Sequence, residues 1–435
     1  MTITLNDPFT LPCGVILPNR IAKAAMTEGL SDKKLQATDR LANLYRTWSE
    51  GGAGLLITGN VMIDQRVLER AGNVAIDITA GGDSLESRVK LQRWAQAGTV
   101  AGNQLWMQIS HAGRQSPRYI TQEPLAPSAV QLDIAGSFAK PRALREDEIL
   151  DFINRFAQVA KIARETGFTG VQIHSAHGYL LSSFLSPITN QRNDAWGGSL
   201  ENRARFLLET MKAVRKEVGH DFPVAIKLNS DDFRKGGFNN EECLRVVEWL
   251  NDASVDLLEI SGGTYEQPRL LGSEGKSDSI VPVRASTKVR EAYFLEYASA
   301  IHKVATMPLM VTGGFRTAEG MEAALNSGDC AVIGLARPLC THPNVPKLLL
   351  ERTMKVTPQY EKDLVIGTRP ILSPASSIEL IKIMNVQGAQ GWYYEQMYRL
   401  ADNQEPEFEL SVPKAYFRYW KNELLSAWKL HQARK

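Results

Sequence analysis

The chain has 435 residues, of which 43% are hydrophobic and 23% are charged, and its formal net charge is +2. These proportions are ordinary for a soluble globular protein with a sizeable core, and the near-neutral charge argues against a nucleic-acid-binding surface. The start, MTITLNDPFT, lacks the basic and apolar regions of a signal peptide, and no apolar run approaches the roughly eighteen residues that cross a bilayer.

The four cysteines, Cys13, Cys243, Cys330 and Cys340, lie far apart and form no C-x-x-C pair. This spacing argues against a zinc ribbon or an iron–sulfur cluster, so no metal site is expected. Unpaired thiols fit a reducing compartment. We therefore expect a cytoplasmic enzyme without a nucleic-acid or membrane partner.

Eight short apolar runs recur along the chain, and polar loops separate them. Their apolarity is continuous rather than alternating, as expected for strands buried on both faces of a parallel sheet. In chain order, the predicted strands are 21–27, 55–62, 103–110, 170–176, 224–230, 257–263, 309–314 and 330–336.

Amphipathic helices are predicted between these strands. Apolar residues repeat with the helical period over residues 149–163, 207–218 and 243–250, so each segment carries one stripe that a sheet would cover. Eight strands alternating with helices predict an α/β fold, a closed (β/α)8 TIM barrel rather than an open doubly wound sheet.

Two connections and the C-terminal segment fall outside this repeat. Residues 111–145 and 264–290 are long βα loops, which usually form lids or substrate walls. The barrel pattern ends near residue 345, which predicts a barrel over 1–345 and a helical, aromatic-rich extension over 346–435. We expect the extension to pack on the barrel or on a neighbouring subunit, which leaves a homo-oligomer open.

The carboxyl ends of the strands of a TIM barrel meet on one face, where such barrels place their chemistry. The segment QIHSAHGYLL, residues 172–181, would bring His174, His177 and Tyr179 to that face. Two imidazoles three residues apart can be metal ligands, catalysts or structural groups. Zinc would need a third protein ligand, which the neighbouring strand ends do not offer in a familiar spacing. They also offer no carboxylate pair, so a glycosidase mechanism lacks its parts.

Two loops of the predicted barrel suit a phosphate group. Gly313 and Gly314 follow the seventh strand, and Ala336 and Arg337 follow the eighth. TIM barrels often bind phosphate at these two loops. A tight turn would explain the two glycines equally well, so the residues alone leave both interpretations open.

Longer motifs match one known family. The matching stretches are LPNRIAKAAMT (17–27), LWMQISHAGRQS (105–116), VQIHSAHGYLLSSFLSPITNQRNDAWGGSLENRARF (171–206), VTGGF (311–315) and GLARP (334–338). Over about residues 17–340, the chain resembles the Old Yellow Enzyme family of FMN-dependent ene-reductases, which have a (β/α)8 barrel.

The resemblance implies an FMN site built from strand-end residues. The Thr27 hydroxyl is expected near N5 and O4 of the flavin, and Gly59 is expected to let the backbone approach the ring. The expected flavin contacts are Ala25, Met26, Thr27, Gly59, Gln108 and Lys227, and the expected phosphate contacts are Gly313, Gly314, Ala336 and Arg337.

The resemblance also implies a substrate site. His174 and His177 are expected to donate hydrogen bonds to the oxygen that activates a small-molecule alkene, and Tyr179 is expected to protonate the product. Two N–H donors would stabilise the charge that develops on that oxygen, as in an oxyanion hole. A phenol with a pKa near 10 is protonated at neutral pH. The implied reaction is ping-pong reduction of enones and nitroalkenes.

Two departures from the family pattern bear on the cofactor. Lys227 stands where many relatives place an arginine, which keeps the positive charge but loses bidentate geometry. The tail lacks the cysteine cluster and second nucleotide domain of the dienoyl-CoA reductase branch, so NADH or NADPH is expected to reduce FMN directly.

Two alternatives differ in class. One is a Schiff-base lyase that uses Lys227 as an amine nucleophile in a phosphate-binding barrel. The other is a protein that binds flavin but does not turn it over.

Overall fold

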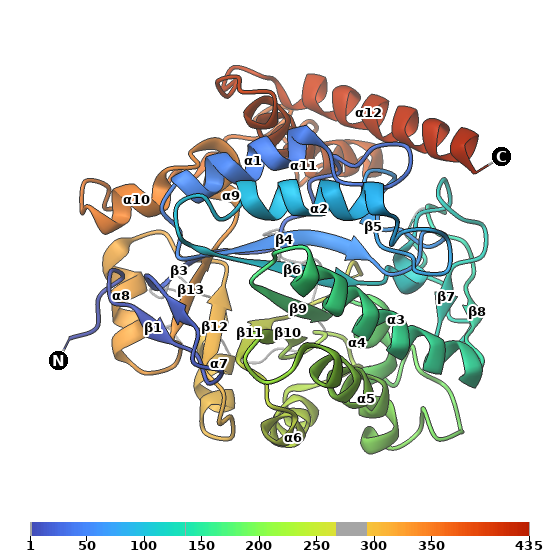
Figure 1. Ribbon diagram of the computed structural model, residues 1–435. Helices are drawn as coiled ribbons and strands as arrows, with labels where there is room; N and C mark the ends of the chain where they lie inside the picture. Colours follow the sequence, from blue (N-terminus) through green and yellow to red (C-terminus); the bar gives the residue numbers. More distant parts are fainter. Residues whose placement is uncertain (1, 135, 267–293, 435) are drawn as a thin grey trace.

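The computed structural model describes residues 2–134, 136–266 and 294–434, and its centre is a ring of parallel strands wrapped by helices (Figure 1). The ring order is β3-β13-β12-β11-β10-β9-β6-β4, and pairing of β3 with β4 closes it. The predicted (β/α)8 barrel is therefore confirmed. The barrel strands are β3 (Ile21–Lys23), β4 (Leu55–Met62), β6 (Gln104–Ser110), β9 (Gly170–Ser175), β10 (Val224–Asn229), β11 (Leu257–Ser261), β12 (Leu309–Thr312) and β13 (Val332–Leu335).

Several strands leave the ladder earlier than their apolar runs end. β3 ends at Lys23, and residues 24–27 continue beyond the ladder toward the catalytic face. β12 ends at Thr312 because Gly313 and Gly314 have φ values of +99° and +86°, in the left-handed region that a strand does not use. The chain beyond the last ladder bonds is therefore free to shape the site.

Helices cover the outside of the barrel. Ser, Thr and Asn side chains cap several of them, accepting hydrogen bonds from the first turn, as Ser199 does from the Asn202 amide at 3.3 Å. The helices of the barrel region are α1 (Asp39–Glu50), α2 (Leu85–Ala97), α3 (Glu146–Glu165), α4 (Leu180–Leu185), α5 (Leu200–Val218), α6 (Asn240–Leu250), α7 (Leu295–His302), α8 (Ala318–Asn326), α9 (Arg337–Thr341) and α10 (Val345–Leu350).

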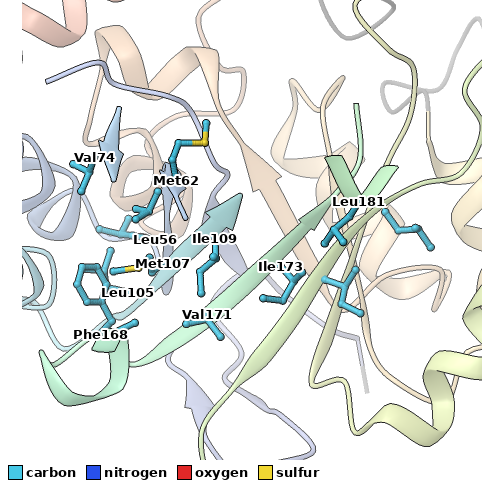
Figure 2. Packing of buried hydrophobic residues seen from close by; sticks show 14 of the residues in the cluster. Leu56, Met62, Val74, Leu105, Met107, Ile109, Phe168, Val171, Ile173 and Leu181 are labelled. Carbon is cyan, nitrogen blue, oxygen red and sulfur yellow. The ribbon is translucent and has the colours of Figure 1, made fainter. Parts of the chain in front are cut away.

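The barrel has two apolar layers. The inner one fills the ring around Trp106 and Met310, and Leu11 and Leu17 of the antiparallel hairpin β1 (Phe9–Thr10) and β2 (Ile16–Leu17) pack against it. The outer one lies between the strands and the helices, where alternate strand side chains such as Met107 and Ile173 point outward (Figure 2). Burial on both faces explains the continuous apolar runs.

The two predicted long loops differ in what the structure describes. The loop over 111–145 contains the 3-10 turn η1 (Gly113–Gln115) and two short strands, β7 (Leu125–Ala126) and β8 (Arg142–Ala143), which pair with each other. Of the loop over 264–290, only residues 264–266 lie within the described residues. One further short strand, β5 (Val74–Ala75), pairs with the end of β4.

The C-terminal extension folds into two long helices, α11 (Glu379–Ala401) and α12 (Val412–Ala433), after the short turn η4 (Tyr360–Lys362). They pack against each other, and α11 also packs on α1 and α9 of the same chain (Figure 1). No helix within the described residues has the length and apolarity needed to span a membrane.

A buried ion pair joins this helix pair to the barrel. Arg70, in the loop after β4, donates from Nε to a Glu423 carboxylate oxygen of α12 at 3.0 Å, and both side chains are 4% exposed. Tyr119 and Tyr398 complete the network, because the Tyr119 hydroxyl donates to Glu423 and Arg70 donates to the Tyr398 hydroxyl, each at 3.1 Å. A second ion pair between the same parts, Arg40 with Asp402, is exposed.

We predict that Glu423→Gln lowers the free energy of unfolding by about 3–5 kcal/mol, because it leaves the buried Arg70 charge without its partner. Asp402→Asn is the matched control. It breaks the exposed pair between the same two parts and is expected to cost at most about 1 kcal/mol. Urea unfolding of both variants measures the difference, and equal small losses would contradict the prediction.

Candidate active site

A cavity of about 150 Å³ opens at the carboxyl ends of the barrel strands. It brings together side chains from the ends of five strands, β3, β4, β6, β9 and β10, from the loop after β4 and from α11. The lining residues are Ala25, Thr27, Asn60, Glu69, Gln108, His174, His177, Tyr179, Lys227 and Tyr394.

His174, at the end of β9, is fixed as a neutral imidazole. Its Nδ1 accepts a hydrogen bond from the Ala176 amide at 3.2 Å, so the ring proton of the neutral form is on Nε2. Burial lowers the pKa of His174 well below its ordinary value, and nearby His177 and Lys227 lower it further. Nε2 is therefore an uncharged donor.

His177 is held differently. Its backbone is left-handed, with φ of +63°, and its amide donates to the Asn229 Oδ1 at 3.0 Å. Its Nε2 is 2.6 Å from the Ser261 hydroxyl. Burial lowers its pKa well below the ordinary value, and Lys227 adds to this. The two imidazoles lie close, with ring centroids 5.1 Å apart, but one ring nitrogen of His177 is already paired with protein.

Tyr179 stands next to His174, with ring centroids 4.8 Å apart. Its hydroxyl is 2.8 Å from that of Tyr265, which lies in the loop after β11. Burial raises the pKa of Tyr179 well above its ordinary value, and the charge of Glu69 raises it further. The phenol therefore holds its proton throughout the neutral range.

Lys227 and Gln108 are joined through a fully buried carboxylate. Glu259 of β11 accepts from Lys227 at 2.9 Å and from the Thr312 hydroxyl at 2.7 Å. Its other oxygen accepts from Gln172 at 2.8 Å, and the Gln172 oxygen accepts from the Gln108 amide at 2.6 Å. This chain of contacts orients Gln108 and pairs the Lys227 Nζ with a buried carboxylate.

The segment after β3 alternates toward and away from the cavity. Ala25 and Thr27 line it, whereas the Met26 sulfur lies 3.5 Å from the Cys340 sulfur on α9. The Thr27 hydroxyl donates to Glu69 at 2.7 Å, and the Asn60 amide donates to the same oxygen at 2.6 Å. The Met26 side chain therefore points toward α9, and contact of this segment with the flavin stays a prediction.

Gly59 is required by the packing of the protein itself, and its expected role beside the flavin stays a prediction. A Cβ at this position would lie 2.4 Å from the Glu28 carboxylate, 2.5 Å from the Met26 carbonyl oxygen and 2.6 Å from the Thr27 Cα. The Gly59 amide also donates to Glu28 at 3.0 Å. The glycine lets the end of β3 pass against β4, which brings Thr27 to the cavity.

The expected phosphate residues directly follow two adjacent strands, β12 and β13. Gly313 has open space where a Cβ would stand, and Ala336 directly precedes α9. Arg337 Nη2 lies 3.9 Å from a Glu361 oxygen, and Arg316 also contacts this carboxylate. Burial raises the pKa of Glu361, but Arg337 and Arg316 outweigh it, and the net pKa is lowered. Two guanidinium groups therefore contact one carboxylate.

Several residues of the site were not predicted from the sequence. No carboxylate pair was expected at the strand ends, but Glu69 lines the cavity and Glu259 contacts Lys227. Gln172 and Glu259 could have been found from the sequence, because each is a polar residue inside an apolar run that predicts a buried strand. Tyr394 has no local signal, since packing of α11 alone brings it to the cavity.

A family model described as the NADH:flavin oxidoreductase / NADH oxidase family matches residues 4–354. The chain is 38% identical to the NADH-dependent flavin oxidoreductase iliE of Hypocrea jecorina, covering 79% of this chain and 88% of that protein. It is 36% identical to the NADH-dependent flavin oxidoreductase iccE of Talaromyces variabilis, covering 91% and 98%. It is 32% identical to the NADH oxidase of Thermoanaerobacter brockii, covering 77% of this chain and 48% of that protein.

Solved structures share the barrel. A 2-naphthoyl-CoA reductase complex has a TM-score of 0.72 at 27% identity, covering 80% of this chain and 52% of that one. An Old Yellow Enzyme homologue from Zymomonas mobilis has a TM-score of 0.67 at 26% identity, covering 82% and 96%.

The described residues fit a flavin mononucleotide. Lys227 and the carbonyl end of Gln108 are polar groups in one cavity, as the pyrimidine edge of a flavin requires. Arg316 and Arg337, which follow the ends of β12 and β13, carry guanidinium groups of the kind that binds a phosphate dianion. The residues expected at the two ends of FMN are therefore compatible with it in chemical type.

Proposed function

Because the chain belongs to the NADH:flavin oxidoreductase / NADH oxidase family, we propose that it reduces activated C=C bonds of enones and nitroalkenes by ping-pong hydride transfer. FMN is the cofactor, and NAD(P)H is the reductant. The names of the relatives favour NADH in this pair.

One observation carries the proposal: a neutral imidazole donor and a protonated phenol lie side by side in the cavity. His174 presents its Nε2–H because Nδ1 is occupied by the Ala176 amide. Tyr179 keeps its proton because burial and Glu69 raise its pKa. Reduction of a conjugated alkene needs two such groups: a hydrogen-bond donor to the activating oxygen, and an acid that protonates the carbon next to the activating group.

In this proposal each residue has a separate task. When bound, FMN supplies the hydride chemistry. His174 donates to the activating oxygen of the alkene, and His177 adds its backbone and ring to that side of the pocket. Tyr179 gives its proton to the carbon next to the activating group, while the Tyr265 hydroxyl orients the phenol. Gln108 and Lys227 hold the pyrimidine edge of the cofactor, with the ammonium supplying a countercharge.

The contacts of Lys227 disfavour the Schiff-base alternative. A nucleophilic amine must lose its proton, but the Lys227 Nζ lies 2.9 Å from the fully buried Glu259 carboxylate, which stabilises the ammonium form. The function is tested by reducing the purified yellow protein with NADH without oxygen and then mixing it with 2-cyclohexenone. Reoxidation of the flavin with formation of cyclohexanone supports the proposal, and the absence of reoxidation would refute it.

We predict that Tyr179→Phe slows flavin reoxidation by 2-cyclohexenone by about 10²–10⁴-fold, because a positioned acid is lost. Flavin reduction by NADH should stay almost unchanged, since no carbon is protonated in that half-reaction. The rate of flavin reoxidation by nitroalkenes should change little, because the nitronate product is stable enough to leave the site without being protonated. Stopped-flow absorbance separates the three rates. If NADH reduction slowed as much as the enone reaction, Tyr179 would be a packing residue.

We predict that His174→Ala lowers turnover of enones by about 10²-fold, whereas His174→Asn, which retains an N–H donor, loses less. Because the pKa of His174 lies well below its ordinary value, the wild-type rate should show no inflection from this residue between pH 6 and 8. Steady-state rates at several pH values test both points. Equal losses in the two variants would show that the hydrogen bond is unimportant.

We predict that Lys227→Met lowers the flavin reduction potential by on the order of tens of millivolts, because the reduced anion loses its countercharge. Lys227→Arg should stay near wild type. Since Lys227→Met also leaves Glu259 unpaired, the double variant Lys227→Met/Glu259→Gln should recover part of the loss. Equilibration with redox dyes gives the potentials. An unchanged potential in Lys227→Met would place the ammonium away from the flavin.

A further inference from the structure

The C-terminal helices contribute one side chain to the cavity. Tyr394 of α11 lines it together with Glu69, His174 and Tyr179. It is the cavity-lining residue that lies outside residues 4–354, the part that the family model matches. The barrel residues of the site thus face a residue supplied by the extension.

The Tyr394 ring is fixed in place by the barrel. The Arg70 guanidinium carbon lies 3.9 Å from its ring centroid, and the Tyr419 ring of α12 is stacked beside it at 5.5 Å. Arg70 itself is held by Glu423 and Tyr398. Two adjacent residues of the loop after β4 therefore have different contacts. Glu69 lines the cavity, whereas Arg70 packs against Tyr394 of α11.

The Tyr394 hydroxyl is available to a ligand. It forms no hydrogen bond with the protein in the part of the chain that the structure describes, and it is not among the buried polar atoms without a partner. The residue as a whole is 9% exposed, and it borders the cavity. Burial raises the pKa of Tyr394, and the hydroxyl stays protonated.

Glu69 gives this part of the cavity its chemical character. Thr27 and Asn60 donate hydrogen bonds to it, and Tyr179 also interacts with it. All three are neutral, and among the described residues no cation forms an ion pair with this carboxylate. In one pocket, a protonated phenol can donate a hydrogen bond to a neutral hydroxyl group of a ligand, and a carboxylate can accept one from it. The same carboxylate repels an anionic substituent.

We propose that Tyr394 and Glu69 form a second polar subsite, which binds a neutral hydroxyl group of the substrate remote from its reactive double bond. The preferred substrates are then hydroxyl-bearing, uncharged enones, and carboxylate-bearing analogues are rejected. This inference rests on the proposed function for its substrate class, and it makes the C-terminal extension a determinant of specificity.

The test uses three probes with one skeleton: benzylideneacetone, its 4-hydroxy derivative and its 4-carboxy derivative. Each is titrated into the oxidised FMN-loaded protein, and dissociation constants follow from the change in flavin absorbance, at a pH where the phenol of the probe is protonated. Wild type should bind the 4-hydroxy probe about fivefold more tightly than benzylideneacetone, as expected for one neutral hydrogen bond. It should bind the 4-carboxy probe about tenfold more weakly or worse.

Two variants separate the contributions. Tyr394→Phe keeps the ring against Arg70 and should remove most of the preference for the hydroxyl, with benzylideneacetone binding unchanged. Glu69→Gln should restore binding of the 4-carboxy probe. Tyr416→Phe is the matched control, because it removes a hydroxyl from α12 at a position that does not line the cavity, and its affinities should equal those of wild type.

Retention of the hydroxyl preference in Tyr394→Phe would overturn the inference. So would a changed FMN content or flavin spectrum in that variant without ligand, since Tyr394 would then contact the cofactor. These binding constants are independent of turnover. Failure of wild type to reduce 2-cyclohexenone would therefore count against the proposed function, whereas a lost preference pattern in an active enzyme counts only against the subsite.

Discussion

Closure of the parallel barrel is the constraint from which the site follows. Pairing of β3 with both β13 and β4 completes the ring, and parallel strands in a ring must all end on the same rim. Residues far apart in the sequence, such as Thr27 and Lys227, thereby line one cavity. The hairpin β1–β2 packs at the inner apolar layer, so the barrel interior is filled rather than open. The chemistry is confined to one end of a rigid core.

The rim carries charges that the barrel has to stabilise. Glu259 is fully buried, and an isolated carboxylate in that position would be costly. Lys227, Thr312 and Gln172 donate to its two carboxylate oxygens. The side-chain oxygen of Gln172 in turn accepts a hydrogen bond from Gln108. The same contacts that offset burial therefore orient two of the groups expected at the cofactor. Stability and cofactor geometry depend here on one network.

The catalytic face also depends on the loop after β4 and on the C-terminal helices α11 and α12. The loop after β4 directs Glu69 into the cavity and Arg70 toward α12, where Glu423 neutralises its charge. The aromatic rings of α11 and α12 cover the Arg70 guanidinium, and Tyr394 among them reaches the cavity. The extension is thus joined to the barrel by a buried polar contact, and the pocket includes part of it.

The sequence by itself determined the barrel and the order of its strands. Strands buried on both faces appear as continuous apolar runs; His174 and Lys227 lie near the ends of two such runs, and Tyr179 follows one of them closely. The tertiary structure alone decided the partners of these residues. Glu69, Tyr265 and Tyr394 lie on loops and a distant helix, whose approach to the cavity depends on packing and not on local periodicity. It also decided that Met26 turns away, that Gly59 serves the crossing of two strands, and that His177 is paired with Ser261. A pattern of residue types records which face of an element is buried, but contacts between elements depend on three-dimensional distances that no short stretch of sequence contains.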